Sequence, residues 1–134
     1  MTAPGEGAPG AGARGRRRRI SRSADFERVY REGRSHASRH LVVYAFPRSS
    51  DGDPRLGVSV GRRVGNAVER NRVKRMLREA FWRLAPALPT EHDFVVVARP
   101  EAGGLARERG EAGVEAALRD LATEAGLLSP EAPA

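Results

Sequence analysis

The sequence predicts one small α+β domain, with elements in the order helix-strand-strand-helix-strand-helix. Its 134 residues fit a single domain. Three short runs, residues 40–46, 55–60 and 93–98, are rich in β-branched and apolar side chains, as strands are. Two longer runs, 66–84 and 111–125, repeat apolar residues at helical spacing. We expect the helices to pack on one face of a small sheet and to leave its other face partly open.

A short helix at residues 23–30 begins the domain. Ser23 is a suitable N-cap, and Gly33 can end the helix. Phe26 and Tyr30 lie four residues apart and therefore on one face. By itself, such a face predicts core packing rather than a binding surface.

Two strands come next in the chain. Residues 40–46 and 55–60 flank a polar turn at 47–54 with Asp51 and Gly52 at its tip. We expect the two strands to pair as a hairpin. The later strand at 93–98 is apolar enough to lie inside the sheet.

The last part of the domain is expected to be a loop and a helix. Gly103 and Gly104, with charged neighbours, predict the loop. The helix covers 111–125 and ends at Gly126. We expect residues 1–15, which are rich in Gly, Ala and Pro, to be a disordered tail. Residues 128–134 are expected to be a second disordered tail, so the folded domain is expected at 16–127. A basic arm at 14–22 is either a solvated tail or a contact with RNA.

Positive charge is concentrated in one segment. Between Arg55 and Arg83 the chain has nine basic and two acidic residues, so this segment alone accounts for the formal net charge of +7. Such a concentrated cationic surface suits a polyphosphate partner.

The long helix at 66–84 carries most of these cations. Its apolar residues form one stripe, while Arg70, Lys74 and Arg78 follow one another at i,i+4. Like-charge pairs at this spacing destabilise an isolated helix by roughly 0.2–0.5 kcal/mol each, so a phosphate-binding face explains them better than a solvated face does. Trp82 lies opposite the stripe, as a surface aromatic or a base-stacking residue. The expected buried stripe is Val73, Met76, Leu77, Ala80, Phe81 and Leu84.

The approach to this helix adds a second anion-binding feature. Gly61 and Gly65 relax the backbone, and Asn66 can cap the helix. The free N–H groups of a helix N-terminus attract phosphate, and Arg62 and Arg63 directly precede them.

No catalytic or metal-binding cluster is evident. His36, His40 and His92 lack the spacing of metal ligands or general bases, and cysteine is absent. No apolar run is long enough to span a membrane. These observations favour a cytoplasmic binding protein with no membrane partner.

Several segments together resemble the protein component of bacterial ribonuclease P. They are Ser-Ala-Asp-Phe-Glu-Arg-Val-Tyr at 23–30, Leu-Gly-Val-Ser-Val at 56–60, Val-Gly-Asn-Ala-Val-Glu-Arg-Asn-Arg-Val-Lys-Arg at 64–75 and Ala-Arg-Pro at 98–100. The resemblance extends from Arg19 to Leu127. It implies a two-layer α/β sandwich of the kind found as a second domain in ribosomal proteins, with a left-handed β-α-β crossover.

The resemblance also implies a function. Ribonuclease P is a ribonucleoprotein endonuclease that removes the 5′ leader from precursor tRNA. Its RNA subunit carries catalysis and holds most of the Mg²⁺, so no metal site is expected in the protein. The implied RNA-binding residues are Arg62, Arg63, Asn66, Arg70, Asn71, Arg72, Lys74, Arg75 and Arg78. The implied leader-binding cleft contains Phe26, Tyr30 and Tyr44.

Other functions are compatible with the residues alone. A stand-alone ribosome-associated protein or RNA chaperone would use the same cations. A DNA-reading helix would favour a helix-turn-helix arrangement, which the pattern lacks, so no DNA partner is expected. A self-contained nuclease would need a catalytic cluster.

Overall fold

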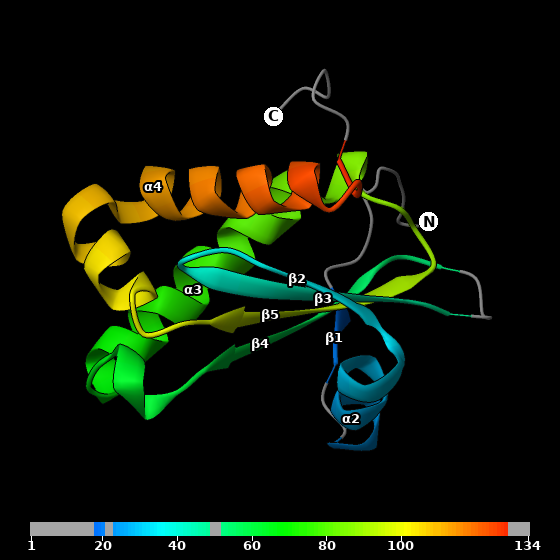
Figure 1. The fold of residues 1–134 in the computed structure, drawn as a ribbon, viewed down its shortest axis with the longest axis horizontal. Coiled ribbons are helices and arrows are strands. Elements are labelled where there is room, and N and C mark those ends of the chain that lie inside the picture. The colour runs from blue at the N-terminus through cyan, green and yellow to red at the C-terminus, as the bar shows by residue number, and fades with distance from the viewer. Residues whose placement is uncertain (1–17, 21–22, 49–51, 129–134) are drawn as a thin grey trace, which may run out of the picture.

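The structure, a computed structural model, describes residues 18–20, 23–48 and 52–128. It is a mixed α+β fold with helices on both sides of one sheet (Figure 1). The predicted alternation of helices and strands is confirmed, and two short strands are added to it. The elements are β1 (Arg18–Arg19), α2 (Ser23–Glu32), β2 (Arg34–Ala37), β3 (Leu41–Pro47), β4 (Arg55–Val60), the 3₁₀ turn η1 (Arg62–Val64), α3 (Ala67–Leu84), the 3₁₀ turn η2 (Ala85–Ala87), β5 (His92–Ala98) and α4 (Ala102–Glu124).

The five strands form one sheet in the order β1-β4-β5-β3-β2. β5 lies in the middle, antiparallel to β3 and parallel to β4. The predicted hairpin between residues 40–46 and 55–60 is therefore wrong, because β5 separates the two strands. Val95 and Val96, adjacent in β5, are both fully buried on opposite faces, and only a central strand can bury both of its faces.

The connection between β4 and β5 runs through α3. The two strands are adjacent and parallel, so a crossover helix must join them. The β-α-β unit expected from the sequence is confirmed, while the left hand of its crossover stays a prediction.

The two edge strands were not predicted. β2 reads Arg-Ser-His-Ala and β1 is the pair Arg18–Arg19, so neither has an apolar alternation that marks a strand. β2 pairs with β3 through a tight turn, and β1 pairs in parallel with β4. The two residues of β1 belong to the basic arm predicted at 14–22, so this part of the arm lies at the edge of the sheet.

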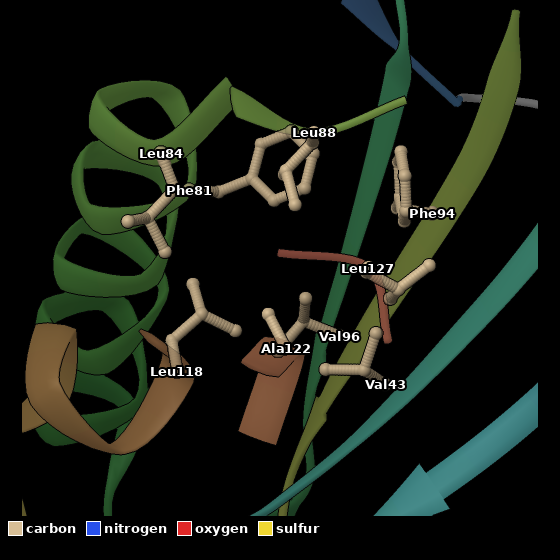
Figure 2. Close-up of a pocket in the computed structure, with 9 residues that line it drawn as sticks. All are labelled: Val43, Phe81, Leu84, Leu88, Phe94, Val96, Leu118, Ala122 and Leu127. Atoms are coloured by element: carbon tan, nitrogen blue, oxygen red, sulfur yellow. The ribbon is translucent and has the colours of Figure 1, made fainter. Parts of the chain in front are cut away.

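The main core lies between the sheet and the pair α3 and α4. All six residues of the predicted α3 stripe are buried, so that prediction is confirmed. This core contains an apolar cavity of about 10 Å³ between α3, α4 and the sheet, with Phe81, Leu84 and Leu88 on one side and Phe94 on another (Figure 2). Such a gap is too small for a ligand, so this core is purely structural.

α2 lies on the opposite face of the sheet, below it in Figure 1. The prediction that the helices share one face is thus wrong for α2. Val29 of α2 packs there with Ile20 and Val95 in a second, smaller cluster. α2 ends as expected at Gly33, whose N–H donates to the carbonyl of Val29 at 2.9 Å. Since a single short helix cannot cover the whole face, part of it stays open.

α4 is longer than predicted. It begins at Ala102, so the loop expected at Gly103 and Gly104 is wrong. Gly103 lies in the first turn of this helix. The position requires glycine, because a side chain there would collide with the carbonyl oxygen of Val64. The helix bends at Gly110, which has φ 62° and ψ −155°.

The helix ends before Gly126, which adopts a φ of 76° as the sequence predicts. Leu128 is 3% exposed, so the fold extends one residue beyond the predicted boundary at 127. The predicted disorder of residues 1–15 and 129–134 lies outside the described residues, as does Asp51 of the β3–β4 turn.

Candidate nucleic-acid interface

The turn η1 places two arginines in front of α3. Val64 is buried and anchors the turn, while Arg62 and Arg63 are exposed. The N–H of Val64 donates to the carbonyl of Gly61 at 3.1 Å, and the N–H of Gly65 donates to the carbonyl of Arg62 at 3.2 Å. The two guanidinium groups are thus presented on a hydrogen-bonded turn rather than on a loose loop.

α3 starts with a capping box. Asn66 Oδ1 accepts from the N–H of Glu69 at 2.9 Å, and Glu69 Oε1 accepts from the N–H of Asn66 at 2.8 Å. Arg70 Nη1 donates to the carbonyl of Gly65 at 2.9 Å. Asn66 and Arg70, both predicted RNA-binding residues, therefore also hold the turn that carries Arg62 and Arg63.

The remaining predicted cations of α3 face outward. Arg72 and Arg75 are exposed together with Asn71, and Lys74 and Arg78 are half-buried. Within residues 18–20, 23–48 and 52–128, no carboxylate forms an ion pair with any of the six cations Arg62, Arg63, Arg72, Lys74, Arg75 and Arg78.

Arginines outside this surface do find carboxylate partners. Arg83 Nε lies 2.7 Å from Glu115 Oε1, and Arg107 Nη1 lies 3.4 Å from Glu69 Oε2. These ion pairs offset the charges of Arg83 and Arg107. Among the described residues, no ion pair offsets the positive charge of the six cations on η1 and α3. A clustered, uncompensated positive surface attracts a polyanion such as RNA.

The three predicted cleft aromatics meet on the other face of the sheet. The Tyr30 ring packs edge-on against Tyr44 with centroids 4.9 Å apart, and Phe26 lies 6.3 Å from Tyr30. Tyr30 is 40% exposed, whereas Phe26 and Tyr44 are half-buried. The cluster therefore combines core packing with one open aromatic surface. Bases of a single strand can stack on such a surface.

β4 places two residues beside this aromatic cluster that the sequence reasoning missed. A side chain at Gly57 would lie 2.6 Å from the ring of Phe26, so glycine is what lets that ring settle on the sheet. Burial raises the pKa of Tyr30, against the opposing effect of its hydrogen bond with Ser59. Gly57 and Ser59 are two residues apart in β4 and therefore share one face of the strand. This spacing was the signal in the sequence that could have placed both residues beside the aromatic cluster.

Trp82 lies elsewhere than predicted. It is half-buried and packs against the main core, edge-on to Phe81 with centroids 4.9 Å apart. The expectation of a surface aromatic opposite the stripe is thus wrong, because Trp82 packs against the main core and is only partly exposed. Trp82 is a packing residue.

Neither a metal cluster nor a membrane helix occurs in the part of the chain that the structure describes. No group of three or more His, Asp or Glu side chains there could hold a metal ion. None of the helices there combines the length and apolarity that crossing a bilayer requires.

Comparison with known proteins decides the family. The family model named Ribonuclease P matches residues 15–122. The chain belongs to the ribonuclease P protein family. The ribonuclease P protein component of Halalkalibacterium halodurans is 38% identical over 113 residues, which cover 84% of this chain and 92% of that protein. The component from Shouchella clausii is 39% identical over 112 residues, covering 84% and 88%.

Solved ribonuclease P proteins share the fold. The Staphylococcus aureus protein matches with a TM-score of 0.74 and 33% identity, over 85% of this chain and 100% of that one. The Thermotoga maritima protein matches with a TM-score of 0.70 and 31% identity, over 78% and 94%. The α+β fold class and the family resemblance predicted from the sequence are confirmed. The chain is the protein subunit of ribonuclease P, a tRNA-processing endoribonuclease, and has an RNA partner.

Proposed function

We propose that the α3 surface binds the catalytic RNA of ribonuclease P. The observation that carries this proposal is the set of cations on η1 and α3 that form no ion pair with a carboxylate in the part of the chain that the structure describes. The contacting residues would be Arg62, Arg63, Asn66, Arg70, Asn71, Arg72, Lys74, Arg75 and Arg78. Among them, Asn66 and Arg70 act mainly by holding the turn, since both already bond the backbone of this chain.

The cleft under α2 binds the 5′ leader of precursor tRNA. The open ring of Tyr30, supported by Phe26 and Tyr44, offers a stacking surface for an unpaired base. This cleft and the α3 surface lie on opposite faces of the sheet. The opposite placement lets one small protein touch two RNA molecules at once, without competition between them.

Catalysis belongs to the RNA subunit, which also supplies most of the Mg²⁺. The protein contributes affinity and position: it holds the leader beside the RNA that cuts it. Among the described residues, side chains of the proposed surfaces are cationic, amide or aromatic, and such groups bind phosphates and bases rather than metal ions.

Reconstitution at low Mg²⁺ tests this function. The full chain is mixed with bacterial ribonuclease P RNA and with precursor tRNA that carries either a long leader or a single-nucleotide leader. We expect the protein to raise the cleavage rate with both substrates and to tighten binding more strongly for the long leader. The RNA alone and the protein alone are the two controls. If the protein changes neither cleavage nor binding, the proposal is wrong, and a stand-alone RNA-binding role becomes the better explanation.

A further inference from the structure

A polar groove lies apart from both surfaces described above. It has a volume of about 460 Å³ and lies between the turn that joins β2 to β3 and the first turns of α4. This size falls within the range of small-ligand sites. The groove is lined by Arg39, His40, Pro100, Glu101, Gly104, Leu105, Arg107, Glu108 and Arg109.

The wall that carries Arg39 and His40 is held by a dense set of hydrogen bonds. Ser38 Oγ accepts from the N–H of Leu41 at 3.2 Å and from the N–H of His40 at 3.3 Å. The N–H of Arg99 donates to the carbonyl of His40 at 2.9 Å, and Arg99 Nη1 donates to the carbonyl of Ser38 at 2.8 Å. A turn tied on both sides presents its side chains with little loss of entropy on binding.

The space in the groove depends on Gly104. A Cβ atom at this position would meet only Arg107 Nη2, at 3.9 Å. Gly104 therefore is not required by packing, unlike its neighbour Gly103, which lies against the carbonyl of Val64. A larger side chain at Gly104 would fill the groove without disturbing the fold.

The charges of the groove indicate what it can bind. Arg39, Arg109, Glu101 and Glu108 form no ion pair with any residue of the described part of the chain. Two carboxylates disfavour a site for phosphate alone. The edge of a nucleobase, however, carries both donors and acceptors, which carboxylates and guanidinium groups recognise. The His40 ring and the arginine planes can stack on its face.

The groove also lies next to the α3 surface. Gly103 of α4 packs on Val64 of η1, and Arg107 on the groove wall reaches Glu69 of α3. RNA bound along Arg62 and Arg63 would therefore pass close to the groove. We propose that the groove binds the base of one unpaired nucleotide of the RNA partner and makes no contact with its phosphate. This proposal rests on the proposed function for the presence of that RNA.

The test compares full-length variants bound to ribonuclease P RNA. Gly104→Met fills the groove, and Glu108→Gln removes one carboxylate charge. Ala112→Met and Glu111→Gln make the same changes on exposed α4 positions outside the groove. We expect the two groove variants to bind the RNA about tenfold more weakly, as the loss of one base contact predicts. The dependence of affinity on salt should not change, because no phosphate contact is removed. Thermal melting shows whether each variant is folded.

A second measurement identifies the nucleotide. Chemical probing of base edges in the RNA should show one unpaired base that the wild type protects and Gly104→Met does not. Groove variants that match their α4 controls in affinity and protection, while the wild type binds, would overturn the groove proposal alone. A reduced salt slope in Gly104→Met would indicate a phosphate contact and would also overturn it. A wild type that fails to bind the RNA contradicts the proposed function itself.

Discussion

Arg55 of β4 and Asp93 of β5 form a bidentate ion pair. Arg55 Nε donates to Asp93 Oδ1 at 2.8 Å, and Nη2 donates to Oδ2 at 2.6 Å. Arg48 Nη1 adds a third bond to Oδ1 at 2.9 Å, although the whole of Asp93 is only 1% exposed. Arg55 also reaches Asp25 of α2 at 3.6 Å. This network fastens α2, and with it the aromatic cleft, to the sheet.

Asp93→Asn should destabilise the fold strongly. The change leaves the side chains of Arg48 and Arg55, which are 8% and 20% exposed, without their shared carboxylate. Removing one partner of a buried pair costs about 3–5 kcal/mol in free energy of unfolding. Urea denaturation measures the loss, with Asp120→Asn on the exposed side of α4 as the matched control. Equal stability of the two variants would contradict the importance of this network.

The same network predicts that stability falls in acid. Burial alone would raise the pKa of Asp93, but hydrogen bonds and charges from Arg55 and Arg48 outweigh it and hold that pKa below its ordinary value. The matching pKa of Arg55 is raised, chiefly by its hydrogen bonds to Asp93. The folded protein thus keeps the carboxylate ionised at a pH where the unfolded chain binds a proton.

The stabilisation by Asp93 is therefore complete above the unfolded pKa of about 4 and is lost as the pH falls through the lower folded value. Unfolding free energies measured from about pH 6 down to about pH 2 should decrease over this window. The decrease should be smaller in Asp93→Asn, which has no carboxyl group to titrate. Parallel curves for the two proteins would show that other groups cause the acid effect.

Arg72→Ala and Arg75→Ala should each weaken binding to ribonuclease P RNA. If each side chain contacts one phosphate, the slope of log affinity against log salt should fall in magnitude by about 0.7–0.9 per variant. Stability should change little, because both side chains are exposed. Arg83→Ala is the control, since Arg83 pairs with Glu115 instead. An unchanged slope in both variants would exclude these phosphate contacts.

Tyr30→Ala should weaken binding of long-leader precursor tRNA to the holoenzyme by about 1–3 kcal/mol, the usual value of one stacked base. The effect should vanish with the single-nucleotide leader. Tyr30→Phe keeps the ring and should bind like the wild type, provided that stacking is the interaction. A loss of affinity in Tyr30→Ala that does not depend on leader length would place the defect outside the cleft.

Local sequence patterns predicted the buried stripe and the N-terminal cap of α3 well. The α3 stripe from Val73 to Leu84 and the cations around it follow from a period that lies within one helix. Asn66 was predicted as a cap for the same local reason, and the capping box with Glu69 confirms it. Trp82 was misplaced, because its packing against the main core does not follow from the period of one helix.

The sequence by itself determined the positions of α2, of α3 and of the C-terminal part of α4, where charge gathers and to which family the chain belongs, because these properties depend on residues close together in the chain. Only the tertiary structure decided that β5 separates β3 from β4 and that α2 lies across the sheet from α3. Both outcomes depend on burying the two faces of β5 at once, a requirement that involves every layer of the fold. The pairing of Asp93 with Arg48 and Arg55, and the groove beside Gly104, arise from that same arrangement.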